Sequence, residues 1–589
     1  MKIGLRSPVW LTLAAAATCA WAAPPSLVFD LAVETTSGGS LTRVHGHGSE
    51  NDGVQGVPMA GGYDVDADGF RDVAIAFMRA DPLGRAGAGE VDLILGAGVI
   101  GETIDSGIDQ ARVLRIYGDE DSGLPNSSVG EATGSEIWMD DVTGDGLGDL
   151  LICRQNYSPA PGRRGAGALT VLVGGPEVGT FADTVQPLDL RNPDPSLTLA
   201  QFVGVDQGDR VGIWARTGDI DGDTIADIVL GADQVDGSGE LNRGALYVIR
   251  GGSHLAASQE IDLTSFGTSP LADHIALVHP PAGSTNFHLG ATCFVADLDG
   301  NGRAEILAAA TINRAGAQIQ PVGANTANAS GGAPDGRMYI VWDENFPSGA
   351  WPASFEFAID TASGEVTTIS GAASNVSFGE ELLGGEDYDG DGRLDLFVGD
   401  LIGNGAAGVA QVIYHAEDLR GLTFAVDAPP PGIEITTILG PGPGALGADT
   451  ATHGDYDNDG ISDLAFGNPH DSPQGRTSAG SMHVLYGNVS RWPSLIDLSV
   501  ATLPDPGVMR IARIDGADGT SGTDGGDTLC YSAATGDIDG DGHDDIIVNE
   551  MLGDGVPPEP TDVGNLLIIS GAGLLQPFML PARGWEIYR

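Results

Sequence analysis

Seven short acidic segments recur along the 589 residues of this chain, and their residue types suit a hard metal ion. Each follows the nine-residue pattern D-x-D-x-D-G-x-x-D, with few departures. Carboxylates at positions 1, 3 and 5 converge on one point if the backbone turns sharply at the position-6 glycine, and such oxygen ligands favour Ca²⁺ over a softer metal. We number the segments loops 1 to 7: DVDADGFRD (64–72), DVTGDGLGD (141–149), DIDGDTIAD (219–227), DLDGNGRAE (297–305), DYDGDGRLD (387–395), DYDNDGISD (455–463) and DIDGDGHDD (537–545).

The pattern predicts up to seven bound Ca²⁺ ions, with five ligand positions in each loop. Positions 1, 3 and 5 supply side-chain oxygens, position 7 supplies a backbone carbonyl and leaves its side chain free to vary, and the position-9 acid can close the shell. The predicted ligands are Asp64, Asp66, Asp68, Phe70, Asp72, Asp141, Thr143, Asp145, Leu147, Asp149, Asp219, Asp221, Asp223, Ile225, Asp227, Asp297, Asp299, Asn301, Arg303, Glu305, Asp387, Asp389, Asp391, Arg393, Asp395, Asp455, Asp457, Asp459, Ile461, Asp463, Asp537, Asp539, Asp541, His543 and Asp545.

Position 12 excludes an EF-hand, which is the obvious alternative for such a loop. An EF-hand needs a bidentate Glu at position 12 and a helix on each side. Each loop is followed instead by a strand-like apolar run, such as VAIAF (73–77) or IIVNE (546–550). Position 12 is apolar in all seven loops: Ile75, Ile152, Leu230, Ala308, Val398, Phe466 and Val548.

Three loops depart from the pattern, whereas loops 1, 5, 6 and 7 keep all four acids and the glycine. Thr143 replaces the position-3 acid of loop 2, and loop 4 uses Asn301 and Glu305. Thr224 replaces the glycine of loop 3, and a β-branched residue is costly wherever the turn needs a positive φ. We therefore expect loop 3 to have the lowest occupancy. We expect calcium to stabilise the fold in every loop, in preference to bridging a ligand.

The elements around the loops predict an all-β, seven-bladed β-propeller of four-stranded antiparallel blades. After each loop and its following strand comes a further apolar strand, and a looser strand precedes the next repeat, which makes four strands per unit of about 80 residues. The outermost strand also has a copy before loop 1, within LVFDLAV and TRVHG (27–46), and none at the end. We therefore predict that residues 41–46 pair beside 565–571 and close the ring.

The chain resembles the FG-GAP repeat propellers, of which the integrin α-chain head is the best-known member. It is most similar to a secreted member of bacterial type. The resemblance rests on the seven loops with their apolar strands, on GADQ (231–234) and GNPH (467–470) in place of Gly-Ala-Pro, and on the pair Phe378–Gly379. It implies that Ca²⁺ binds on one face of the propeller and that ligands dock on the other. It also implies extracellular recognition or adhesion.

Composition and the N-terminus predict an exported protein that does not bind nucleic acid. Against 82 Asp+Glu stand 27 Lys+Arg, and a formal charge of −55 repels phosphate backbones. Lys2 and Arg6, an apolar run and Ala20–Ala22 have the order of a secretory signal, whose apolar core is too short for a membrane span. We predict cleavage near Ala22, a propeller over 23–572, a tail over 573–589, and a secreted, cell-surface or periplasmic monomer.

The cysteines and two histidines carry weaker signals. Lipid attachment at Cys19 is an open alternative. Cys153, Cys293 and Cys530 lie in apolar stretches, and we interpret them as buried thiols. His45 and His47 stand two residues apart near a strand end, and we interpret them as a surface pair in preference to a metal site.

The second turns of the blades are expected to form the face opposite the acidic loops, and they carry several arginines in an otherwise acidic chain. One hypothesis is a basic ring that binds acidic glycans, and the other is that each arginine pairs with an aspartate of the loops. The arginines are Arg79, Arg85, Arg154, Arg163, Arg164, Arg243, Arg314 and Arg476.

The function predicted from the sequence is extracellular recognition of a protein or glycan, without catalysis. The chain has no G-x-S-x-G, H-E-x-x-H or G-x-x-x-x-G-K-[ST] motif, and we assign no catalytic residue. A secreted carbohydrate-active enzyme, either a polysaccharide lyase or a hydrolase, remains the alternative, because a carboxylate pair is a spatial property that sequence does not show. A purely structural envelope component is a third interpretation.

Overall fold

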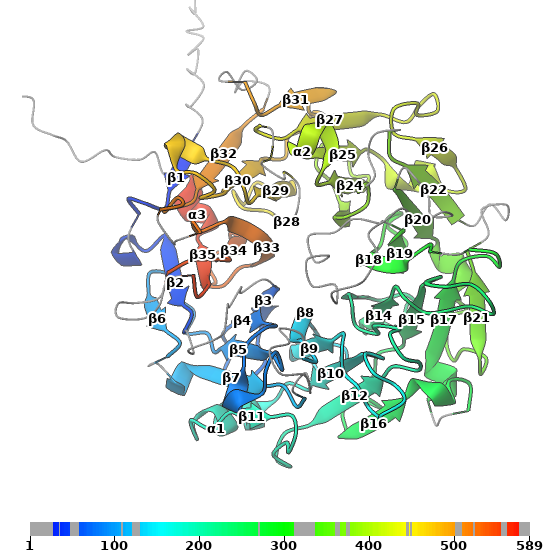
Figure 1. Cartoon of the computed structure of the whole chain (residues 1–589). Helices are drawn as coiled ribbons and strands as arrows, with labels where there is room; N and C mark the ends of the chain where they lie inside the picture. Colours follow the sequence, from blue (N-terminus) through cyan, green and yellow to red (C-terminus); the bar gives the residue numbers. More distant parts are fainter. Residues whose placement is uncertain are drawn as a thin grey trace, which may run out of the picture.

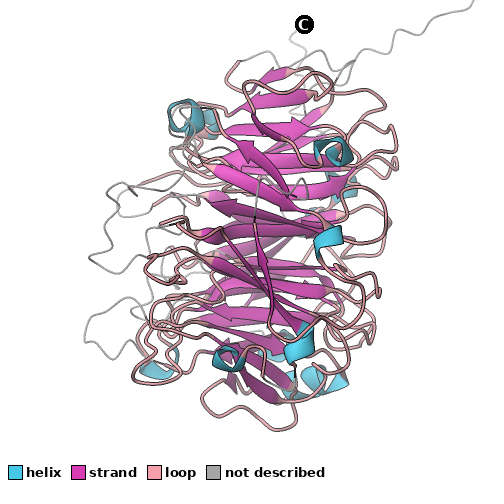
Figure 2. Ribbon diagram, turned by 90° about the vertical axis from the view of Figure 1, so that its right-hand side faces the viewer, coloured by secondary structure: helices cyan, strands magenta, loops and turns pink. Residues whose placement is uncertain are grey.

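The protein is a ring of seven β-sheets around a central axis, as a computed structural model shows (Figure 1). Seen from the side, the strands run between two faces on which the loops gather (Figure 2). The structure describes residues 27–575 except 35, 48–57, 108–109, 121–129, 269–270, 285, 311–335, 360–365, 373–376, 443, 445–446, 448–449, 501–508, 522–524 and 555–561. The predicted signal peptide and most of the predicted tail therefore lie outside the described residues.

Each sheet is one blade, and the predicted seven-bladed all-β propeller is confirmed. We number the blades by their acidic loops. From the axis outward, the strands of blades 1 to 4 are β3 (Met59–Tyr63), β4 (Asp72–Phe77), β5 (Glu90–Ile94), β7 (Val113–Tyr117) and β11 (Leu188–Asp189); β8 (Thr133–Asp140), β9 (Asp149–Arg154), β10 (Ala168–Leu172), β12 (Leu199–Val203) and β16 (Gln259–Asp262); β13 (Ala215–Gly218), β14 (Asp227–Ala232), β15 (Ala245–Ile249), β17 (Ile275–His279) and β21 (Phe355–Ala358); and β18 (Leu289–Ala296), β19 (Glu305–Ala310), β20 (Arg337–Val341), β22 (Val366–Ser370) and β26 (Thr423–Ala425).

Blades 5 to 7 repeat this order, and the helices are short. The strands are β23 (Leu382–Glu386), β24 (Asp395–Asp400), β25 (Val409–Ile413), β27 (Ile435–Leu439) and β31 (Leu495–Asp497); β28 (Ala451–Gly454), β29 (Asp463–Asn468), β30 (Ser481–Leu485), β32 (Ile511–Asp515) and β1 (Leu27–Asp30); and β33 (Leu529–Gly536), β34 (Asp545–Glu550), β35 (Asn565–Ile569), β2 (Leu41–His45) and β6 (Thr103–Asp105). The helices are α1 (Pro176–Ala182), α2 (Gly403–Ala406), α3 (Gly571–Leu574), η1 (Thr36–Gly38), η2 (Pro82–Gly84), η3 (Gln110–Arg112), η4 (Leu263–Ser265), η5 (Ala272–His274), η7 (Asp343–Asn345), η8 (Ala416–Leu419) and η9 (Pro473–Gly475).

The second strand of every blade is a continuous apolar run because it is buried on both faces of its sheet. All six residues of each of these strands are buried, on both faces of the sheet. A blade packs against a neighbour on each side, so neither face of its inner strands meets water. Cys153, Cys293 and Cys530 are buried thiols within these packed layers, as predicted. In the described part of the chain, no helix is long and apolar enough to cross a membrane.

Each blade has five strands, one more than the four predicted. After the third strand of one blade, the chain crosses to the outer edge of the preceding blade, pairs there in parallel, and returns to form its own fourth strand. These strands span only two to four residues, for example Leu188–Asp189, and so carry almost no periodic signal. They cover the sheet edges that four-stranded blades would leave open.

The ring closes through the N-terminal segment, as predicted. β2 pairs antiparallel with β35, with Leu41 opposite Ile569 and His45 opposite Asn565. β1 pairs in parallel with β32 of blade 6. The N-terminal segment therefore supplies both strands that would follow β35 if the repeat continued (Figure 1). Blade 7 is built from the two ends of the described chain.

Candidate functional site

All seven acidic loops share one hydrogen-bonded frame. The position-6 amide donates to the position-1 carboxylate at 2.7–3.2 Å in every loop. The position-7 amide donates to the side-chain oxygen of position 5 at 2.8–3.0 Å. These bonds aim the side chains of positions 1 and 5 into the turn. The sequence pattern and the backbone conformation therefore specify each other.

Position 6 lies in the left-handed region of backbone space in all seven loops. Its φ is 93° at Gly69 of loop 1 and lies between 84° and 90° at the other five glycines. Thr224 of loop 3 is held at φ 72°. A β-branched residue in this conformation is strained by about 1–3 kcal/mol. The cost foreseen for loop 3 is therefore present, whereas its calcium occupancy stays a prediction.

The position-9 acid is a buried clamp as well as a candidate ligand. In every loop one of its oxygens accepts the position-2 amide, and the other accepts an amide that follows the third strand of the blade. All seven acids are at most 1% exposed. Burial raises the pKa of this group, to about 7 at Asp72 and to about 9 at Glu305. A positive charge placed in the loop would favour the ionised form.

The donor set fits a hard cation. Oxygens of positions 1, 3 and 9 lie within 4.8 Å of one another in loops 1, 3 and 4. The buried Oδ1 atoms of Asp64, Asp221 and Asp457 have no hydrogen-bond partner. A buried carboxylate oxygen without a donor is costly, and a bound Ca²⁺ would satisfy it. The loops would supply only oxygen ligands, as the sequence analysis expected.

Arginines pair with the position-3 aspartate in four loops, which the local sequence pattern does not reveal. Arg491 Nε lies 2.7 Å from Asp389 Oδ2 in loop 5. Three further ion pairs have the same form: Arg250–Asp221, Arg420–Asp299 and Arg510–Asp457. Each arginine is distant in sequence from its loop. A guanidinium at this point offsets part of the negative charge that attracts a cation.

The loops are also linked to one another around the ring. The position-8 amide of one loop donates to the position-1 carbonyl of the preceding loop in four pairs, for example Gly148 to Asp64 at 2.8 Å. The position-7 side chain packs on the preceding loop: a Cβ atom on Gly144 would lie 2.7 Å from Cδ1 of Ile225. The expectation that this side chain is unconstrained was therefore incomplete. Ordering one loop orders the contact with the next blade.

A cavity of about 810 Å³ runs along the axis of the propeller. Its wall comes from the innermost strands, together with residues of loop 1, such as Asp64, at one end and with second-turn residues, such as Arg79 and Gln155, at the other. We call these two ends the acid-loop face and the second-turn face. The wall combines aromatic rings with hydroxyl, amide and charged groups. This composition is typical of a binding pocket for a polar organic ligand.

Part of the cavity wall is a rigid aromatic stack. The guanidinium of Arg216 lies 4.3 Å from the ring centre of Trp138 and 4.9 Å from that of Trp214, and it donates to Glu136 at 2.8 Å. Trp138 donates to Thr217 at 2.8 Å. The buried indole nitrogen of Trp214 has no hydrogen-bond partner. The sequence does not reveal this stack, because its members come from two different blades.

Among the described residues, five of the second-turn arginines pair with carboxylates and are not free to form an open basic ring. Three of them hold the fifth strand of their own blade through its last aspartate, at 2.6–2.7 Å: Arg85–Asp189, Arg163–Asp262 and Arg476–Asp30. Two others pair with nearby glutamates: Arg154–Glu131 and Arg243–Glu240. Arg314 lies outside the described residues. Five of the eight arginines are therefore paired with carboxylates, three of them with aspartates, but these aspartates end the fifth strands and do not belong to the acidic loops. The three Arg–Asp pairs hold a segment of the next blade's chain against their own blade.

Comparisons with known proteins support the repeat and give little beyond it. The FG-GAP repeat family matches residues 531–569, which contain loop 7, strands β34 and β35 and most of β33. A search among curated proteins found no match. Two solved structures are distantly similar: rhamnogalacturonan lyase from Bacillus licheniformis, at 13% identity and TM-score 0.38 over 90% of this chain and 75% of that one, and Sqt1 from Chaetomium thermophilum, at 10% identity and TM-score 0.34 over 90% and 99%.

Proposed function

The chain is a β-propeller of the FG-GAP repeat family, and we propose that it acts outside the cell as a calcium-stabilised module that recognises a protein or glycan ligand. In this proposal the N-terminal segment is cleaved near Ala22 and the propeller works as a monomer. Ca²⁺ occupies the acidic loops and ligands enter from the second-turn face. The ions stabilise the ring and take no part in binding the ligand.

The proposed role of calcium is supported by the way the loops join the blades. Each loop holds a position-9 clamp, and neighbouring loops share backbone hydrogen bonds. An ion that draws the acids of one loop together would also stabilise these contacts between blades. Extracellular modules of this kind bind Ca²⁺ with Kd values of about 10⁻⁴–10⁻³ M, so filled loops are expected outside the cell.

The observation that carries the recognition proposal is the axial cavity with its aromatic stack. Trp138 and Trp214 are fixed by Arg216 and Glu136 before any ligand arrives, which lowers the entropic cost of binding. Flat apolar rings beside carboxylates and hydroxyls match the faces and hydroxyl groups of sugar rings. We therefore favour a glycan, bound through sugars that enter the cavity, over a protein.

The pairing of the second-turn arginines bears on the charge of that glycan. Arg85, Arg163 and Arg476 already serve aspartates of the fifth strands. Acidic side chains, including Glu136 and Glu381, line the cavity itself. A polyanion would meet repulsion from these groups and from the acidic surface. We favour a neutral saccharide over the acidic glycan that the arginines of the sequence suggested.

The experiment is a retention assay on neutral and acidic polysaccharides in millimolar Ca²⁺, with new chain ends measured in parallel. We expect retention on a neutral polysaccharide without cleavage, and a loss of at least tenfold in affinity for Trp214→Ala. Phe70→Ala is the matched control, because Phe70 is an exposed aromatic residue on the acid-loop face. An equal loss of affinity in both variants would contradict the proposal. So would a protein that is retained on neither the neutral nor the acidic polysaccharides.

Cleavage of a polysaccharide is the second candidate function, and one hydrogen-bonded pair of side chains at the cavity favours it. Tyr531 lines the cavity, and its hydroxyl lies 2.6 Å from Nε2 of His470. Burial lowers the pKa of His470, so the ring is neutral near pH 7 and can accept the phenolic proton. Cleavage that is lost in Tyr531→Phe while retention persists would establish this function and displace the non-catalytic one.

A further inference from the structure

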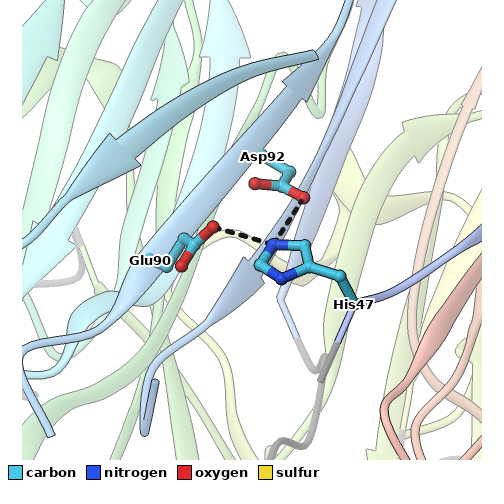
Figure 3. Close-up of side chains that lie close together, drawn as sticks. All are labelled: His47, Glu90 and Asp92. Carbon is cyan, nitrogen blue, oxygen red and sulfur yellow. Dashed lines mark hydrogen bonds and ion pairs between the residues drawn. The ribbon is translucent and has the colours of Figure 1, made fainter. Parts of the chain in front are cut away.

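One cluster of titratable side chains lies away from the acidic loops, where the ring closes. His47 follows β2, the fourth strand of blade 7, and Glu90 and Asp92 stand on one face of β5 in blade 1. Figure 3 shows the imidazole pointing between the two carboxylates. The Nε2 atom lies 3.0 Å from Glu90 Oε1 and 3.7 Å from Asp92 Oδ2. The cluster therefore joins two facing sheets that are not consecutive in the chain.

Asp92 is the unusual member of this cluster. It is 0% exposed, and neither of its carboxylate oxygens has a hydrogen-bond partner. Burial and the neighbouring charge of Glu90 raise its pKa. A buried carboxylate with no donor is costly unless a positive charge lies at hand. One of these two unsatisfied oxygens, Oδ2, faces the imidazole (Figure 3).

The protein supplies less positive charge than the cluster needs. Arg115 Nε lies 3.8 Å from Glu90 Oε1, which is a long ion pair. With a neutral imidazole, two carboxylates and one guanidinium leave the cluster at a net charge of −1. His47 can add one further charge by taking up a proton. A divalent cation bound to the same three side chains would bring the net charge to +1.

We propose that His47, Glu90 and Asp92 bind one divalent transition-metal ion of the Zn²⁺ type. The ligands are Nε2 of the imidazole and one oxygen from each carboxylate, and they lie within 4.8 Å of one another. Ligand atoms about 2.0–2.1 Å from Zn²⁺ in a tetrahedron stand roughly 3.3 Å apart, close to the separations of 3.0 and 3.7 Å in this cluster. The imidazole nitrogen selects this ion over Ca²⁺.

The partial exposure of His47 offers a route for the ion. The side chain of His47 is 19% exposed, whereas those of Glu90 and Asp92 are 6% and 0% exposed. An ion would reach the cluster past the imidazole, and water would complete the tetrahedron. Bound there, it would hold the segment after β2 against β5 and so tie the N-terminal strands to blade 1.

A second histidine cluster shows what an unsuitable site looks like in the same molecule. Asp389, Asp391 and His415 also bring three ligand atoms together, in loop 5. There, however, both ring nitrogens of His415 face guanidinium groups: Arg491 Nη2 lies 2.6 Å from Nε2, and Arg393 contacts Nδ1. The two guanidinium groups block both ring nitrogens, so His415 cannot serve as a ligand for a transition-metal ion. This cluster serves as the internal control.

The test is a calorimetric Zn²⁺ titration of the purified protein in excess Ca²⁺, which fills the acidic loops, with visible absorption of Co²⁺ as a second readout. We expect one Zn²⁺ per chain and a Co²⁺ spectrum typical of a nitrogen and oxygen ligand set. His47→Gln should weaken Zn²⁺ binding at least 100-fold, and His415→Gln should leave it unchanged. Absence of a site for Zn²⁺ or Co²⁺, or equal effects of the two variants, would overturn the proposal.

A melting experiment separates metal binding from a simple ion-pair cluster. Asp92→Asn removes a buried charge and keeps the shape of the side chain. If a metal ion is the natural partner, this variant melts no lower than the unmutated protein in the presence of a chelator, and it loses the rise in Tm that Zn²⁺ produces. If a protonated His47 is the partner, the variant melts lower in the chelator, and the proposal fails.

Discussion

Loops 1 and 3 have the same acids and the same hydrogen-bonded frame, yet they differ in two respects that decide how well each can hold an ion. Gly69 occupies the left-handed turn of loop 1, whereas Thr224 is forced into it in loop 3. Asp221 of loop 3 pairs with Arg250, whereas the structure gives Asp66 of loop 1 no such ion pair among the described residues. Thus the acidic pattern sets the frame, and its surroundings set the strain and the local charge.

The largest effect should come from withdrawing calcium from the whole protein. At 10 mM Ca²⁺ and a Kd of about 10⁻⁴–10⁻³ M, each filled loop adds about 1.4–2.7 kcal/mol to the free energy of unfolding. We expect excess EDTA to lower Tm by about 10 °C or more, measured by circular dichroism. An unchanged melt would remove the basis for comparing the loops as ion sites.

Disabling one loop at a time should separate loop 1 from loop 3. Asp64→Asn and Asp219→Asn make the same chemical change at position 1. We expect Asp64→Asn to reduce the calcium-dependent part of the unfolding free energy by about 1.4–2.7 kcal/mol, because loop 1 is expected to be filled. Asp219→Asn should reduce it by less than half as much. Equal losses in urea titrations with and without Ca²⁺ would mean that the two loops are equivalent.

Exchanging the position-6 residues tests the strain directly. Gly69→Thr places a β-branched residue at φ 93° and should lower stability by about 1–3 kcal/mol. Thr224→Gly should relieve strain in loop 3 and raise its calcium affinity, although the added freedom of the unfolded chain offsets part of the gain. The measurements are the urea midpoint and the calcium titration of each variant. A fall in affinity on Thr224→Gly would show that strain is not what limits loop 3.

The smallest effect concerns the charge of Arg250. Arg250→Gln removes the guanidinium from Asp221 and should raise the calcium affinity of loop 3 several-fold at low salt. The same variant should be less stable in EDTA, because Asp221 is buried and loses its partner. Arg112→Gln is the control, since Arg112 pairs with Glu102 at 2.7 Å, outside the acidic loops. A lower calcium affinity in Arg250→Gln would show that the arginine helps to order the loop.

The sequence predicted the fold well because the propeller repeats one local pattern seven times. The acidic turn, the apolar second strand and the count of outer strands together predicted seven blades, and the pairing of β2 with β35 is confirmed. The fifth strands were missed because segments as short as Leu188–Asp189 have no periodicity to detect. Their positions depend on which edge of the preceding blade is open, and that is known only once the ring is assembled.

The candidate sites show the same division between what the local sequence predicted and what the assembled ring decided. By itself the sequence determined the seven acidic turns, because residues at most eight positions apart meet through local backbone geometry. Only the tertiary structure brought Arg250 to Asp221, stacked Trp138 and Trp214 on Arg216, and placed His47 beside Glu90 and Asp92. Each of these contacts joins separate strands or blades. Sheet packing and ring closure bring such neighbours together, and the spacing of residues along the chain does not predict them.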